Sequence, residues 1–223
     1  MIADPNRPDL LVDVFPVGPI QANCVLVGDR AAGELAVIDP GEEAERILDR
    51  IERTGMAARL VLHTHGHLDH AGGTADLVAR LGRDAVRVGL HRDELELYRG
   101  LEAQGRMFGL ATDAPPEPDL WLEHGQRIPI GGIELEVRCT PGHSPGGVSF
   151  VVLGGQEELV VVGDTLFAGS VGRTDLWGGA SSVLAQSIRE QLYTLPDDTR
   201  VVCGHGPDTT IAREKATNPF VRG

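Results

Sequence analysis

The chain has 223 residues, of which 41% are hydrophobic and 24% are charged, as in an ordinary globular protein. Its net charge of −13 argues against nucleic acid or an anionic membrane surface as the main partner. A small anionic substrate is compatible with this charge, because bound divalent cations reverse the local field.

The first part of the chain predicts strands followed by a helix. Strands are expected at Asp9–Val17, Asn23–Gly28 and Leu35–Asp39, where apolar runs alternate with glycine-bearing turns. A helix is expected at Glu42–Arg53, because its apolar residues recur at helical spacing and a glycine follows it. Leu60–Leu62 predicts the next strand, which ends at a run of histidines.

The middle of the chain predicts a helix at Thr74–Leu81, a strand at Ala85–Leu90 and an amphipathic segment at Glu94–Leu110 that packs on the core. The later strands are expected at Ile133–Arg138, Val148–Leu153, Leu159–Val162 and Arg200–Cys203. The later helices are expected at Val183–Leu192 and Ile211–Ala216. This alternation predicts a layered, mixed α/β protein, and we expect residues 1–223 to form a single domain.

The segment from Thr64 to His70 concentrates metal-binding side chains. Within seven residues it carries three imidazoles and a carboxylate, those of His65, His67, Asp69 and His70. Such groups are the ligands that zinc and ferrous iron prefer, and burying them beside an apolar strand is costly unless something pairs with them. We therefore predict a metal site. Because positions two apart diverge on a helix, we expect this run to be a loop that leaves a strand.

Three further ligand candidates follow predicted strands, namely His143, Asp164 and His205. Each comes directly after a glycine, which lets the backbone turn sharply. Five of the eight histidines thus lie at strand-to-loop positions, where functional sites are usually built.

The order His-x-His-x-Asp-His, then His, then Asp, then Gly-His-Gly resembles the metallo-β-lactamase superfamily of metal-dependent hydrolases, from Asp39 to His205. The stretches Gly163–Phe167 and Gly172–Asp175 are similar to the glyoxalase II-like branch, and the tail Ala212–Phe220 is similar to its short bacterial members. The resemblance implies a four-layer αββα sandwich with mixed sheets. The chain departs from longer glyoxalase II enzymes in one respect: we expect it to lack their C-terminal helical domain, which binds glutathione, because it stops soon after His205.

The resemblance also implies a set of metal ligands. One metal ion would be bound by His65, His67 and His143. A second would be bound by Asp69, His70 and His205. Asp164 would bridge both ions, and Asp69 would in addition orient the nucleophilic water. We expect two divalent ions, with zinc first and iron or manganese as alternatives, since histidine and carboxylate sites accept all three.

Two more residues receive a role from the resemblance. Arg173 occupies the position of a basic residue that holds the carboxylate of a thiol substrate. Asp39 resembles a position that supports the ligand loops from behind, as metal sites usually require.

The expected reaction is hydrolysis of a thioester by a metal-bridged hydroxide. Neighbouring metal ions can share a hydroxide and polarise the attacked oxygen, and a thiolate leaving group needs little protonation. An acyl conjugate of a small thiol, such as a 2-hydroxyacyl-glutathione, is therefore the expected substrate.

Two alternatives of the same fold stay open. A persulfide dioxygenase would bind one iron through His65, His143 and Asp164. Leu-Trp-Gly-Gly follows Asp175, where such dioxygenases have a phenylalanine, and this difference favours the hydrolase. A lactonase or phosphodiesterase would share the ligands, since the pocket and not the metal site selects the substrate.

The expected lack of a membrane span or signal peptide, together with the few cysteines, predicts a cytoplasmic protein. No apolar stretch is long enough to span a bilayer, and Met1–Pro8 lacks the apolar core of a signal peptide, which argues against a secreted β-lactamase. The three cysteines are scattered and odd in number, so no disulfide framework is predicted and Cys203 receives no role. His63 is expected to pack beside the ligand run or to support it.

Overall fold

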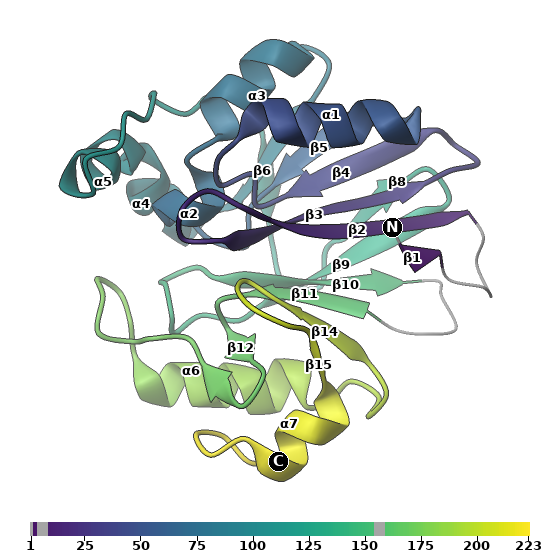
Figure 1. Cartoon of the computed structure of the whole chain (residues 1–223). Helices are drawn as coiled ribbons and strands as arrows, with labels where there is room; N and C mark the ends of the chain where they lie inside the picture. The colour runs from purple at the N-terminus through teal and green to yellow at the C-terminus, as the bar shows by residue number, and fades with distance from the viewer. Residues whose placement is uncertain (1, 4–8, 154–158) are drawn as a thin grey trace.

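Two β-sheets pack face to face in the computed structural model, which describes residues 2–3, 9–153 and 159–223 (Figure 1). The strands of the first sheet are, in spatial order, β1 (Ile2–Ala3), β2 (Leu10–Val17), β3 (Ala22–Asp29), β4 (Glu34–Ile38), β5 (Ala57–Leu62), β6 (Arg87–His91) and β7 (Leu120–Leu122). Strands β1 to β4 pair antiparallel, whereas β4 to β7 pair parallel. The first sheet is therefore mixed, as predicted.

The second sheet is mixed as well. Its strands are, in spatial order, β15 (Thr209–Thr210), β14 (Arg200–Cys203), β11 (Leu159–Gly163), β10 (Val148–Leu153), β9 (Ile133–Cys139) and β8 (Arg127–Ile130). Only β11 and β14 pair parallel among the described strands of this sheet. A separate hairpin is formed by β12 (Leu166–Phe167) and β13 (Ser170–Val171).

Helices cover the outer face of each sheet (Figure 1). The first sheet is covered by α1 (Ala44–Thr54) and α3 (Thr74–Leu81), and the second by α6 (Ser181–Ser187) and α7 (Ile211–Thr217). The four-layer αββα sandwich is thereby confirmed. In the described part of the chain, no helix has the length and hydrophobicity needed to cross a membrane. Of Met1–Pro8, only Ile2–Ala3 belongs to the described residues.

Apolar side chains on both faces of the strands explain why the layers pack against one another. In β3, Val25 and Val27 face the second sheet, while Cys24 and Leu26 face the helices. Successive side chains of a strand point to opposite faces, so an apolar strand such as β3 contributes to both cores. Three buried clusters result: one between the sheets and one under each helical layer.

Some predicted boundaries differ from the structure. The helix predicted from Glu42 begins at Ala44, because Glu43 adopts a left-handed backbone with φ of 57°. The helix predicted at Val183–Leu192 is α6, which continues as a π-helical turn, η2 (Ile188–Leu192). Strands β12, β13 and β15 were not predicted, because two residues are too few to show periodicity.

The segment Glu94–Leu110 is broken into short helices. These are η1 (Arg92–Glu94), α4 (Leu95–Arg99) and α5 (Leu101–Met107). The buried side chains of Tyr98 and Leu101 belong to the core cluster under the first helical layer. The predicted packing of this segment is thus confirmed.

Candidate metal centre

The ligand candidates come together where strands of both sheets end. Because β4 and β5 run parallel, the segments that follow them, beginning at Asp39 and His63, leave the first sheet at the same edge. Likewise β11 and β14 run parallel, and Asp164 and His205 follow their ends in the second sheet. Backbone hydrogen bonds join the two sheets here: Val148 N donates to Thr64 O at 2.8 Å, and Asn23 N donates to Gly204 O at 2.7 Å.

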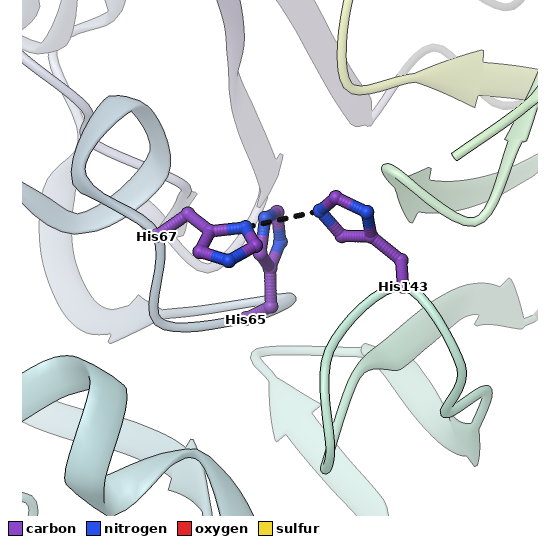
Figure 2. A group of neighbouring side chains, drawn as sticks. All are labelled: His65, His67 and His143. Atoms are coloured by element: carbon purple, nitrogen blue, oxygen red, sulfur yellow. Dashed lines mark hydrogen bonds between the residues drawn. The ribbon is translucent and has the colours of Figure 1, made fainter. Parts of the chain in front are cut away.

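The first cluster consists of three histidines, His65, His67 and His143 (Figure 2). Two of them follow β5 and the third lies on the loop after β9. Each offers one ring nitrogen, and these atoms lie within 4.8 Å of one another. The closest pair is Nδ1 of His67 and Nε2 of His143, which are 3.0 Å apart. We call this group the imidazole cluster.

The second cluster consists of Asp69, His70 and His205, whose ligand atoms also lie within 4.8 Å of one another. Nε2 of His205 is 3.1 Å from Oδ2 of Asp69 and 3.3 Å from Nε2 of His70. We call this group the carboxylate cluster.

One expectation about the ligand run is wrong. The run is a loop only up to His67, and Asp69 and His70 lie on a short helix, α2 (Leu68–Ala71). The divergence of positions two apart applies to His65 and His67, which are indeed outside the helix. Asp69 and His70 are adjacent and therefore only about 100° apart around the helix, so both can contribute to one cluster.

Asp164 lies between the two clusters. Its Oδ1 is 3.3 Å from Nε2 of His70 and 3.6 Å from Nε2 of His205. Its Oδ2 is 3.7 Å from Nε2 of His143. One carboxylate oxygen thus faces each cluster, and the bridging role of Asp164 stays a prediction.

The imidazole cluster is electrically neutral at pH 7. Burial, together with the neighbouring His143, lowers the pKa of His67 to about 4. Burial also lowers the pKa of His65 well below its ordinary value, with the surrounding histidines adding to the effect. For His143, burial outweighs the attraction of Asp164, and the pKa again falls. These rings therefore present lone pairs and not charge.

The carboxylate cluster has the opposite character. Burial opposes the charged form of His70, but Asp164 and Asp69 outweigh it and raise the pKa of this histidine well above its ordinary value. Burial likewise opposes the ionised forms of Asp69 and Asp164, yet His70 and His205 hold the pKa of both carboxyls below the ordinary range. This side of the site is therefore a network of oppositely charged groups.

The hydrogen bonds around His65 fit a bound cation. The hydroxyl of Thr64 donates to Oδ2 of Asp39 at 2.6 Å, so its oxygen accepts from Nδ1 of His65 at 3.0 Å. With the proton of neutral His65 on Nδ1, Nε2 carries a lone pair. That atom is buried and has no hydrogen-bond partner among the described residues. A metal ion is the partner that such an orphaned lone pair lacks.

The rings of His143 and His70 are oriented in the same manner. Nδ1 of His143 donates to the carbonyl oxygen of Arg173 at 2.8 Å, and Nδ1 of His70 is 2.9 Å from Oδ2 of Asp39. Each bond directs Nε2 toward the centre, as is usual for metal-binding histidines. Buried Asp39 also accepts from the backbone N–H of Thr64 at 2.7 Å. It therefore forms three hydrogen bonds with two residues of the ligand run, Thr64 and His70.

Arg173 contacts the site through its backbone. Its guanidinium forms a two-point ion pair with Asp175 at 2.7 and 2.8 Å, and the side chain is 61% exposed. The predicted contact with a substrate carboxylate stays a prediction.

Sequence reasoning missed two residues that contact the ligand loops: Thr64, which bonds His65, and Glu94, which accepts from the backbone N–H groups of Gly66 and Gly146. Thr64 could have been suspected from its place beside His65. Glu94 carried no signal, because it is one of several acidic residues on an amphipathic segment. His63 packs against Tyr98, with ring centroids 5.3 Å apart, as expected. Burial raises the pKa of the Cys203 thiol to about 12, so this residue offers no thiolate.

Comparison with known proteins adds independent findings. A family model described as the metallo-beta-lactamase superfamily matches residues 17–205, which include every ligand candidate. The hydroxyacylglutathione hydrolase GloC of Haemophilus influenzae is 37% identical over 94% of this chain and 97% of its own. Among solved structures, TTHA1623 in a di-iron-bound form is 42% identical, with a TM-score of 0.83 over 94% of this chain and 100% of its own. The B3 metallo-beta-lactamase BLEG-1 is 34% identical, with a TM-score of 0.86 over 96% and 100%.

Proposed function

Since the chain belongs to the metallo-beta-lactamase superfamily of metallo-hydrolases, we propose that it hydrolyses a thioester of a small thiol with two divalent metal ions. The observation that carries the proposal is the position of Asp164, whose two oxygens face two separate ligand clusters. A pair of neighbouring ions suits hydrolysis, because together they can stabilise both the attacking and the leaving atom.

The imidazole cluster would hold one ion through His65, His67 and His143, and the carboxylate cluster would hold the other. When bound, such ions supply a nucleophile at neutral pH and Lewis-acid stabilisation of the developing oxyanion. The TTHA1623 structure, which is in a di-iron-bound form, supports iron alongside zinc as a candidate metal.

The protein's own groups divide the remaining work. Asp69 has a pKa below the ordinary range, so its carboxylate is ionised at neutral pH and can accept a hydrogen bond from the attacking water. Asp39, Thr64 and the carbonyl of Arg173 hold the imidazole rings in fixed orientations. The leaving thiolate is a weak base and needs no strong general acid, which suits a site whose histidines serve as ligands.

The thioester is favoured over other substrates by the relative named hydroxyacylglutathione hydrolase, which matches almost the whole chain. We propose that Arg173 binds a carboxylate of the thiol. The side chain stands on the same loop whose backbone contacts His143, and its exposure leaves the guanidinium accessible from solvent.

The proposal is tested by turnover assays on the metal-loaded protein. We expect release of thiol from a 2-hydroxyacyl-glutathione, together with about two metal ions per chain by elemental analysis. A lactone, a β-lactam and a glutathione persulfide serve as competing substrates. Oxygen uptake with the persulfide and a single iron per chain would show that the protein is a dioxygenase and not a hydrolase. Preferential cleavage of the β-lactam or the lactone would contradict the thioester as the substrate.

A further inference from the structure

A buried carboxylate lies behind the imidazole cluster. Glu94, the last residue of η1, has a relative exposure of 0%. Its Oε2 accepts a hydrogen bond from the backbone N–H of Gly66 at 2.7 Å, and its Oε1 accepts one from the N–H of Gly146 at 2.6 Å. Gly66 separates the ligands His65 and His67, whereas Gly146 lies on the loop that carries His143.

Both glycines are needed for this contact. A Cβ on Gly66 would lie 2.9 Å from the backbone nitrogen of Tyr98, and a Cβ on Gly146 would lie 2.9 Å from Cβ of Asp93. Real Cβ atoms essentially never come so close to other atoms. The segment that carries Glu94 is therefore in tight contact with the backbones of both ligand loops.

The charge of Glu94 is compensated by backbone groups. In the described part of the chain it has no lysine or arginine partner within ion-pair distance. A buried carboxylate without partners is strongly unfavourable, and hydrogen bonds from N–H groups to an ionised oxygen are short and strong. Neither the core nor the surface requires an acid here, since an apolar side chain would fill the same space without this desolvation cost.

Glu94 is a side chain that accepts hydrogen bonds from both loops, beside the direct backbone bond from Val148 N to Thr64 O. The two loops come from different sheets, and the imidazole cluster exists only if their spacing is correct. We propose that Glu94 is a positioning residue that fixes the loop of His65 and His67 relative to the loop of His143 at the spacing that one shared metal ion requires. The proposal rests on the proposed metal centre and adds to it a residue that touches no ligand side chain.

The test uses Glu94→Gln in two backgrounds that each retain one cluster. In His205→Ala only the imidazole cluster is complete, and in His143→Ala only the carboxylate cluster is complete. The amide of glutamine can accept from one loop, but its NH₂ group opposes the N–H of the other. We expect Glu94→Gln to weaken Zn²⁺ or Co²⁺ binding about 10–100-fold in the His205→Ala background, and less than about 3-fold in the His143→Ala background. Competition with a chelator of known affinity measures both values.

The matched control is Glu96→Gln, which removes the same charge from an exposed position two residues away. It should leave metal binding unchanged in both backgrounds. Glu94→Asp keeps the charge with a shorter reach and should weaken the imidazole cluster as well. If Glu94→Gln does not fold, as judged by circular dichroism, Glu94→Asp carries the same comparison.

Equal loss of affinity in both backgrounds, or no loss in either, would overturn the positioning role. Failure of the wild-type protein to bind any metal would instead contradict the proposed centre, so the two failures are distinguishable.

Discussion

The imidazole cluster and the carboxylate cluster meet at Asp164, yet they are built in different ways. The first has neutral ligands on two loops, and the buried acid behind it, Glu94, accepts hydrogen bonds from the backbone N–H groups of both loops. The second has a charged ligand set, and the buried acid behind it, Asp39, contacts the ring of His70 directly. Loop spacing is therefore the sensitive property of the first cluster, whereas hydrogen bonding and charge are the sensitive properties of the second.

The largest expected effect comes from removing the residue that both clusters share. Asp164→Ala takes away one oxygen from each cluster and should abolish retention of both metal ions and hydrolysis, a loss larger than the about 100-fold typical of a supporting residue. Metal content after gel filtration and thioester turnover measure the change. Full activity in this variant would show that the bridging assignment is wrong.

The second-largest effects are expected from two variants that each disable one cluster. His143→Ala and His205→Ala should each reduce the metal content by about one ion per chain and reduce turnover more than 100-fold. The remaining sites should differ in metal preference: the three imidazoles left by His205→Ala should favour Zn²⁺ over Mn²⁺ more strongly than the carboxylates left by His143→Ala. Competitive titrations with both ions check this order, and identical preferences would contradict the contrast between the clusters.

A smaller effect is expected from the supporting acid of the carboxylate cluster. Asp39→Asn leaves one acceptor oxygen for three donors, the N–H and O–H of Thr64 and the ring of His70. Metal affinity should fall about 10–100-fold, with His70 affected first. Asp49→Asn, an exposed change on α1, is the control. Unchanged affinity in Asp39→Asn would leave this residue without the supporting role.

The smallest effect is expected from a change that does not alter the metal content. Arg173→Ala removes an exposed guanidinium that pairs with Asp175, and surface ion pairs contribute little to stability. Loss of a charged contact to the substrate should raise KM about 10-fold with little change in kcat or metal content. The matched change Arg127→Ala lies on β8 and should not alter KM. A fall in kcat alone would argue against a role in substrate binding.

The features that could be predicted from the sequence are those marked by residues close together in the chain. Ligand candidates next to a strand end, such as His65 and Asp164, could be singled out because a buried strand followed by a polar, glycine-flanked turn is a local pattern. The long strands and helices were found from their periodicity. Placement of these elements in four layers came from the resemblance to a family and not from periodicity.

The contacts that hold the ligands were harder to predict. Glu94 is about 30 residues from Gly66 and about 50 from Gly146 in the chain, and nothing local marks it as buried. Two-residue strands such as β15 exist only because a neighbouring strand offers hydrogen bonds. Such features depend on tertiary pairing, which a single sequence does not encode in any short window.

The position of the ligand clusters where the two sheets meet also bears on how the protein folds. The ligand candidates span His65 to His205, so no cluster can be completed by one sheet alone, and contacts of such long range form late. The imidazole cluster needs a loop from each sheet, and the carboxylate cluster joins α2 to the end of β14. Capture of a metal ion during refolding would therefore report the moment at which the sheets dock, and a spectroscopically visible ion such as Co²⁺ would serve as a clock for that step.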